Sequence, residues 1–231
     1  MNLSILSIYF QDHEIRIKLP KNYFKTERKS YPLVIVQDGD YLFKDVKVDV
    51  VFAGVVPKDR KQDYTPWHTN VNGIEYGGKA DDYLEWIANE LLPYLKKCFS
   101  ISKEHKDIAI AGASLGGLVS LYGLLTEKNV FGSYILISPS MWYPGFLKYM
   151  REHEILKQPR HVYWYVGELE GKQNKLLTQS MVSQTEQGVD ILNELLISEQ
   201  SMFYFVTNRK GIHRKYYFKN ISNMQLRNYF D

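Results

Sequence analysis

The sequence predicts an α/β protein whose mostly parallel, twisted sheet of about eight strands carries helices on both faces. Two observations favour this fold class. Near-continuous apolar runs recur along the chain, as expected for strands that are buried on both faces. Segments with helical spacing separate these runs. The chain of 231 residues is long enough to bury one large core, and no linker divides it. We therefore expect a single domain over residues 1–231.

The expected strands begin with an antiparallel hairpin, because the segment "EIRIKL" alternates apolar and polar side chains. The later strands are expected where apolar or β-branched residues run together and turn residues follow. In chain order, the expected strands are Leu3–Phe10, Glu14–Leu19, Leu33–Val36, Val46–Val56, Ile108–Ala111, Tyr134–Ile137, His161–Val166 and Met202–Val206.

The expected helices alternate with the later strands. Ala80–Lys97 is amphipathic at helical spacing, and Pro93 is expected to kink it. Further helices are expected at Leu118–Leu125, within Lys175–Ile197 and from Arg214 onward.

Two connections stand out. Only ten residues separate Gln37 from Val48, so a crossover there has room for a helix of one or two turns at most. Pro57 to Gly78 is a long polar stretch, and loops of that length in compact domains are often functional.

Composition gives no reason to expect several classes of partner. The chain has 29 basic and 26 acidic residues, a balance that gives no reason to expect a nucleic-acid ligand. Its single cysteine, Cys98, cannot form an internal disulfide. No apolar run approaches the ~18–20 residues of a membrane span, and the first residues lack a signal-peptide pattern. We expect a soluble, cytoplasmic protein that does not bind membranes.

The strongest chemical motif is Gly112-Ala113-Ser114-Leu115-Gly116, a G-x-S-x-G sequence between an expected strand and an expected helix. Small neighbours would allow a sharp turn that lifts the Ser114 hydroxyl above the sheet edge. Free N–H groups at the helix N-terminus would then face developing negative charge. The alternative is a tight packing turn without chemistry. A phosphate-binding loop is disfavoured because no Lys-Ser or Lys-Thr pair follows.

A serine nucleophile needs a base and an acid that orients the base. Of six histidines, His213 is the best placed, because it follows the last expected strand and Gly211 would permit a turn. Glu168 and Glu170 follow the preceding strand, where catalytic groups gather in such sheets. The chain order is then serine, acid, histidine, as in α/β-hydrolases.

With these residues in view, the sequence resembles the α/β-hydrolase superfamily, and within it the esterase family that includes esterase D and the enterochelin (siderophore) esterases. The matching segments are "VIVQDGD", "VPKDRKQDYTPW", "IAGASLGGLVSLYGL", "LISPSMWY", "VGELEG" and "GIHRKYYF", and they span nearly the whole chain.

The resemblance implies roles for individual residues. Ser114 matches the nucleophile, His213 the base and Glu170, preferred to Glu168, the acid. The oxyanion hole would use the backbone N–H groups of Asp40 and Leu115. The residues implied to line the substrate pocket are Arg60, Trp142 and Trp67.

The function implied is a serine esterase that acts through an acyl-enzyme on a small-molecule ester, with no metal or organic cofactor. The siderophore-esterase resemblance favours a ferric siderophore ester, such as an enterochelin-like trilactone. Two alternatives stay open: a general short-acyl carboxylesterase or thioesterase, and a non-catalytic ligand-binding protein of the same fold. The sequence also departs from the family. Lys210 stands where a glycine is common, the acid is Glu rather than Asp, and the short segment after Asp40 puts the oxyanion loop in question.

Overall fold

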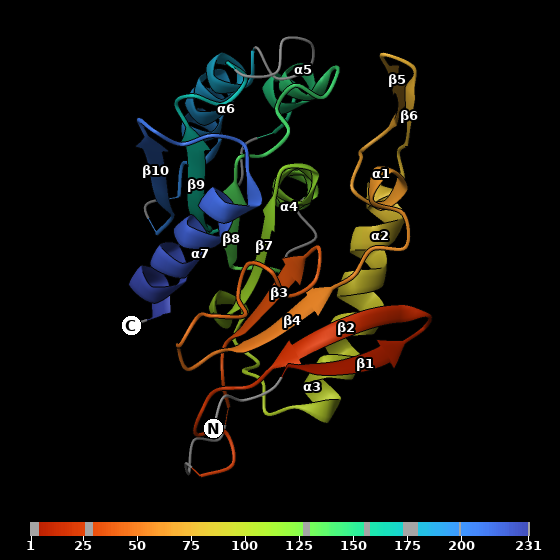
Figure 1. Cartoon of the computed structure of the whole chain (residues 1–231), viewed down its shortest axis with the longest axis vertical. Helices are drawn as coiled ribbons and strands as arrows, with labels where there is room; N and C mark the ends of the chain where they lie inside the picture. Colours follow the sequence, from red (N-terminus) through yellow and green to blue (C-terminus); the bar gives the residue numbers. More distant parts are fainter. Residues whose placement is uncertain are drawn as a thin grey trace.

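The computed structural model describes residues 5–25, 30–126, 130–154, 158–172, 180–198 and 200–230, with side chains up to residue 222. An eight-stranded sheet forms its centre, in the order β1-β2-β4-β3-β7-β8-β9-β10 (Figure 1). The strands are β1 (Leu6–Phe10), β2 (His13–Lys18), β3 (Leu33–Gln37), β4 (Val51–Val55), β7 (Ile108–Ala113), β8 (Ser133–Ile137), β9 (His161–Gly167) and β10 (Met202–Asn208). β2 pairs antiparallel with β1 and β4, and all other neighbours are parallel.

Alternate residues of each central strand enter different apolar cores, because successive side chains point to opposite sheet faces. Leu33 and Ile35 of β3 belong to a core closed by helices. Val34 and Val36 belong to a second core closed by the segment after β3 and by the C-terminal helix. The sheet therefore lies between two covering layers, as the sequence predicted.

The helices that cover the first face lie between successive strands in the sequence. They are α2 (Ala80–Trp86), α3 (Leu92–Cys98), α4 (Leu115–Leu125), α5 (Phe146–Arg151) and α6 (Met181–Leu195). On the second face lies α7 (Lys215–Phe230), with Phe218 and Ile221 in the core. None of the described helices combines the length and the apolar character that crossing a bilayer requires.

Most expected strands and helices are found, with limits that differ by a few residues. Residues 3–4 of the expected first strand and residues 175–179 of the segment preceding α6 lie outside the described part of the chain. The run Val46–Val56 yields a strand only over Val51–Val55. Upstream of it, Val46, Val48 and Val50 are buried while the residues between them are exposed, so that stretch packs on the sheet without joining it. Turns rather than a helix follow β3, which agrees with the limit of one or two helical turns that the short connection set.

The stretch expected as a long polar loop is more structured than predicted. It holds the short helix α1 (Arg60–Asp63) and a hairpin of β5 (His68–Val71) and β6 (Ile74–Gly77), which stands apart from the main sheet in Figure 1. The turn residues Asn72 and Gly73 have φ values of 51° and 78°. An Asn-Gly pair between alternating residues is a strong hairpin signal, and it was present in the sequence.

Pro93 is preceded by a wider turn of its helix, whereas the sequence predicts a kink there. A π-helical segment, Ile87–Leu91, joins α2 to α3, and the Leu92 N–H donates to the Ile87 carbonyl. Proline lacks an N–H and its ring crowds the preceding turn. One extra residue in that turn makes room for the ring and keeps the helix continuous.

Candidate active site

Ser114 stands at the sharp turn between β7 and α4. Its backbone has φ 59° and ψ −121°, a conformation that is costly for a residue with a Cβ. Two backbone hydrogen bonds hold the turn: the Ser114 N–H donates to the Ile137 carbonyl at 3.0 Å, and the Ser140 N–H donates to the Ser114 carbonyl at 3.1 Å. The strained conformation is therefore imposed by the neighbouring strand β8 and the loop after it.

The glycines of the motif permit this turn because nothing larger would fit. A Cβ added at Gly112 would lie 2.2 Å from the Gly116 carbonyl oxygen. One added at Gly116 would lie 2.9 Å from the Cβ of Gln37, at the end of β3. The first turn of α4 is thus packed directly against β7 and against the end of β3, and the Ser114 hydroxyl is left on the open side of the turn.

The described structure brings Ser114, His213 and Glu170 together in one hydrogen-bonded row. The Ser114 Oγ lies 2.9 Å from His213 Nε2, and His213 Nδ1 lies 2.7 Å from Glu170 Oε2. A carboxylate can only accept, so Nδ1 carries the proton and Nε2 is free to accept from the serine. Ser114 follows β7, Glu170 follows β9 and His213 follows β10, so three loops at the same edge of the sheet supply the row.

Glu170 is almost completely buried, with 2% of its surface exposed, and its carboxylate is fully partnered. The Ser138 Oγ donates to Oε1 at 2.6 Å, and the Gly167 N–H donates to the same oxygen at 2.9 Å. His213 takes the other oxygen. A buried charge needs such partners, and these also fix the direction in which the carboxylate faces the imidazole. Ser138 was not singled out by the sequence analysis, although the quoted "SPS" segment contains it.

The alternative acid, Glu168, points elsewhere. Its Oε1 accepts from the Thr207 hydroxyl at 2.8 Å, at an exposed position. The loops after β9 and β10 touch through two glycines, because a Cβ on Gly167 would lie 2.4 Å from the Gly211 carbonyl carbon. This close approach brings His213 to Glu170 and leaves Lys210, next to Gly211, exposed on the outside.

The two backbone N–H groups expected at the oxyanion hole are both without an acceptor among the described residues. The Gly39 N–H donates to Val55 and the Asp38 N–H to Tyr64, while no such bond is found for Asp40 or Leu115. The Asp40 carboxylate accepts from Arg16 of β2, which fixes its side chain against that strand. Both amides are therefore available to a ligand.

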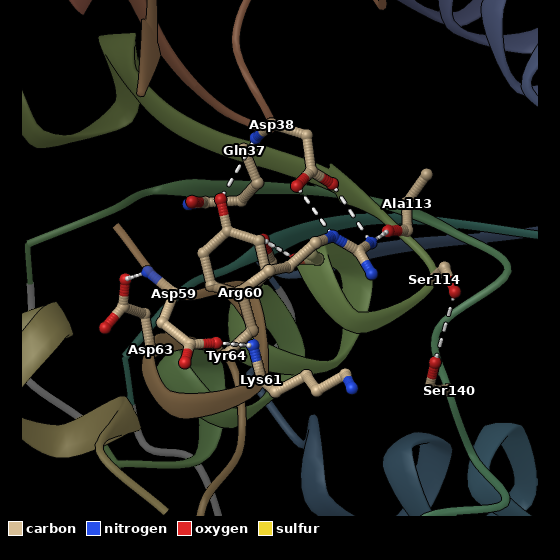
Figure 2. Close-up of polar contacts among 12 residues, drawn as sticks. Gln37, Asp38, Asp59, Arg60, Lys61, Asp63, Tyr64, Ala113, Ser114 and Ser140 are labelled. Carbon is tan, nitrogen blue, oxygen red and sulfur yellow. Dashed lines mark hydrogen bonds and ion pairs between the residues drawn. The ribbon is translucent and has the colours of Figure 1, made fainter. Parts of the chain in front are cut away.

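Arg60 lies between the turn after β3 and the Ser114 turn (Figure 2). Its Nε and Nη2 donate to the two Asp38 carboxylate oxygens at 2.7 and 3.0 Å, and Nη2 also reaches the Ala113 carbonyl at 3.3 Å. The hydrogen bonds and charge of Asp38 outweigh the opposing effect of burial, and the pKa of Arg60 is raised. Asp38 is a partner that the sequence analysis did not identify, though it directly follows a strand in the expected site.

Trp142 and Trp67 meet in an aromatic group between the hairpin and the loop after β8. Trp142 lies edge-on to Tyr76 with ring centroids 5.8 Å apart. The Trp67 Nε1 donates to the Pro144 carbonyl at 3.0 Å, and its ring packs on Tyr143. Trp67 is thereby fixed in the packing of this loop, and Trp142 stands two residues beyond Ser140. The Ser140 Oγ itself lies 3.3 Å from the Ser114 Oγ (Figure 2).

Comparison with known proteins gives this geometry a context. Residues 10–220 match the family described as "Putative esterase". The "Uncharacterized protein YbbA" of Bacillus subtilis is 27% identical over 220 residues, which cover 89% of this chain and 88% of that protein. "Ferri-bacillibactin esterase BesA" of the same organism is 34% identical over 102 residues, covering 42% of this chain and 34% of its own.

Among solved structures, an IroE-like serine hydrolase from Shewanella oneidensis superposes with a TM-score of 0.77 at 21% identity. The match covers 92% of this chain and 73% of the other. This likeness covers most of the chain, and it agrees with the fold that the sequence predicted. Because the family match spans most of the chain, the protein belongs to the Putative esterase family and is a carboxylic ester hydrolase of the α/β-hydrolase fold.

Proposed function

We propose that this esterase is a serine hydrolase in which Ser114 is the nucleophile, His213 the base and Glu170 the acid. The observation that carries the proposal is the unbroken row from the Ser114 Oγ through both His213 nitrogens to Glu170, at 2.9 and 2.7 Å. The strained Ser114 backbone supports it, because such strain accompanies nucleophiles held at a strand-to-helix turn. The burial of Glu170 also supports it, since a buried carboxylate with fixed partners orients the imidazole.

The first half-reaction follows from this row. The Ser114 Oγ attacks the ester carbonyl carbon while its proton passes to His213 Nε2, and Glu170 stabilises the resulting imidazolium. The carbonyl oxygen gains the negative charge and accepts hydrogen bonds from the Asp40 and Leu115 amides. Each such donor contributes about 3–4 kcal/mol in comparable sites. The C–O bond to the alcohol then breaks, and His213 returns the proton to the leaving oxygen.

The second half-reaction repeats these roles with water. His213 takes a proton from a water molecule, whose oxygen attacks the acyl carbon on Ser114. The same two amides hold the second oxyanion. Its collapse breaks the bond to the Ser114 Oγ, to which His213 returns the proton, so the carboxylic acid is released and the Ser114 hydroxyl is restored. The chain's own residues supply every proton transfer in this scheme.

We further propose a siderophore ester as the substrate. The similarity to a ferri-bacillibactin esterase over 102 residues supports this substrate class. The aromatic group that contains Trp142 supports it as well, because aromatic side chains stack on aromatic ligands and provide a broad apolar wall. In this proposal Trp142 contacts the substrate, and Trp67 holds the loop that carries it.

Comparison of two substrates tests the proposal. Hydrolysis of a tricatecholate trilactone, free and with bound ferric iron, is measured beside hydrolysis of p-nitrophenyl butyrate. The proposal predicts a kcat/KM for the trilactone at least about tenfold higher, and a selective loss of that preference in Trp142→Ala. Preference for the butyrate ester would instead indicate a general short-acyl esterase, and no turnover of either would favour a ligand-binding role.

A further inference from the structure

A chain of contacts ties the turn after β3 to the turn that carries Ser114. At its centre is the Arg60 side chain, which extends from the start of α1 to Asp38 and to the Ala113 carbonyl (Figure 2). Asp38 lies two residues before Asp40, and Ala113 lies two residues before Leu115. One guanidinium therefore contacts the two segments whose amides we assign to the oxyanion hole.

At the Arg60 end of this series of contacts, other residues hold the side chain in place. Asp59 caps the short helix α1, and its Oδ1 accepts from the Lys61 N–H at 2.9 Å. The Arg60 guanidinium lies 5.6 Å from the centre of the Tyr64 ring, within the range of a cation–π contact. The two parallel bonds to Asp38 add a fixed direction, which a single ion pair would not provide.

The Asp38 end has a second attachment through a buried pair of tyrosines. The Asp38 N–H donates to the Tyr64 hydroxyl at 3.0 Å, and the Tyr83 hydroxyl donates to Gln37. Burial raises the pKa of both tyrosines, so their hydroxyls stay protonated over the working pH range. Asp38 has φ 64° and Gly39 has φ 78°, two successive residues in the left-handed region. A turn of this shape keeps its conformation because its surroundings impose it.

The charge of the Arg60–Asp38 pair limits what it can bind. Asp38 occupies Nε and Nη2 and neutralises the guanidinium, so the pair offers little net positive charge to an anionic ligand. A residue whose main purpose is to hold a catecholate or carboxylate would present its fork of donors to the ligand. In Arg60, Nε and Nη2 already donate to oxygens of Asp38 and Ala113.

We propose that Arg60 and Asp38 together form a brace that sets the spacing between the Asp40 and Leu115 amides. Arg60 is then a positioning residue and not a substrate-binding residue. This inference rests on the proposed serine-hydrolase mechanism. An oxyanion hole depends on donors that are already aimed at the developing charge, and a displacement of about 1 Å can cost about 100-fold in rate. Breaking the brace should therefore weaken transition-state stabilisation while ground-state binding of a small neutral ester is unchanged.

The test compares Arg60→Gln, Arg60→Lys, Asp38→Asn and the double variant Arg60→Gln/Asp38→Asn, with Lys61→Gln as the matched control. Lys61 is the next residue of α1, is exposed and makes no side-chain contact in Figure 2. With p-nitrophenyl butyrate, the brace predicts a kcat lower by about 10- to 100-fold in each single variant and a KM within about two-fold of wild type. Arg60→Lys should not restore kcat, because lysine cannot bridge both partners. The double variant should be no slower than the worse single variant, since one contact is lost either way.

A second measurement separates this inference from the proposed mechanism. The rate of covalent labelling by a neutral alkyl fluorophosphonate depends on the nucleophile and on the same amides, but it needs no particular substrate. The brace predicts labelling that is about 10- to 100-fold slower in the Arg60 and Asp38 variants and unchanged in Lys61→Gln. Thermal unfolding of each variant shows that it is folded.

Three results would overturn the inference. Variants that are labelled at the wild-type rate, or a raised KM with unchanged kcat, would show that Arg60 does not position the amides. Additive losses in the double variant would show that the two residues act separately. A wild-type protein that does not label at all is a separate outcome, because it would contradict the serine-hydrolase mechanism on which this inference rests.

Discussion

At the scale of single residues, the site depends on one buried carboxylate with a fixed direction. Glu170 accepts from Ser138, from the Gly167 amide and from His213, so neither oxygen is free to rotate. Ser138 has φ 45°, which, like the Ser114 conformation, is unusual for a residue other than glycine. Two strained serines thus lie at the two ends of the proposed catalytic row, one bonded to the acid and one to the base.

Glu170→Gln tests the role of this carboxylate. An amide in its place can donate to His213 Nδ1 and so favour the tautomer that cannot accept from Ser114. In a comparable triad the equivalent change lowers kcat by about 10⁴-fold. We expect a loss of about 10²- to 10⁴-fold in kcat with p-nitrophenyl butyrate and little change in KM.

Glu168→Gln is the matched control, because Glu168 lies in the same loop and bonds to Thr207 instead. It should keep activity within about two-fold of wild type. A Glu170→Gln protein of normal activity would show that the reaction runs on Ser114 and His213 alone. An equal loss in both variants would show that the loss comes from a disturbed loop and not from the missing acid.

At the scale of elements, close backbone contacts decide where the loops of the proposed catalytic row lie. Gly54 of β4 approaches the Gly39 carbonyl, and a Cβ there would lie 2.3 Å from that oxygen. Gly167 and Gly211 bring together the loops after β9 and β10 in the same way. Sequence patterns predicted the strands before these loops, because buried parallel strands are apolar runs. Patterns could not predict the approach of loops that are far apart in the chain.

Gly211→Ala tests this contact. The added methyl would lie 2.4 Å from the Tyr165 Oη and 2.7 Å from the Gly167 Cα, so the loop that carries His213 must shift. Overpacking of this kind costs about 1–3 kcal/mol of stability. We expect a lower melting temperature and a kcat reduced by about tenfold or more, because His213 moves away from Ser114.

Lys210→Ala, at the exposed neighbouring position, should change neither the melting temperature nor kcat appreciably. An active and fully stable Gly211→Ala protein would mean that the two loops tolerate a larger separation than the structure indicates.

The predictability of the fold also differs from element to element. The main sheet and its large helices follow from hydrophobic periodicity. The sequence predicts a loop where the hairpin β5–β6 lies, although the Asn-Gly pair at its turn is a hairpin signal. The helix α5 of six residues gave no sequence signal, since so short a segment is helical only through its packing, with Phe146 and Met150 buried. Of the site residues, Ser138 and Asp38 were missed because their roles depend on partners that only the folded chain brings near.

At the scale of the whole molecule, partly buried histidines couple stability to pH. Burial lowers the pKa of His13, His105 and His161, and for His105 the nearby Arg160 and Lys96 act in the same direction. As the pH falls, the histidines of the unfolded chain bind protons near pH 6.5, whereas those of the folded chain bind protons only at lower pH. Stability from these groups is present above that pH and is lost as the pH falls through their folded pKa values.

The melting temperature should therefore fall when the pH is lowered from about 7.5 to about 5.5. His105→Gln should reduce the size of this fall, because glutamine does not titrate and removes one of the groups responsible. Differential scanning calorimetry of both proteins at the two pH values measures the effect. A pH-independent melting temperature in the wild type, or an unchanged fall in His105→Gln, would contradict this account.

The central claim is that Ser114 is the nucleophile of this ester hydrolase, and site-mapped covalent labelling tests it most directly. The wild-type protein is treated with the alkyl fluorophosphonate, digested, and analysed by peptide mass spectrometry. We predict one phosphonyl group per chain, on the peptide that contains Ser114, and none in Ser114→Ala. A wild-type protein that remains unlabelled, or a label that persists in Ser114→Ala on another residue such as Ser140, would contradict the claim.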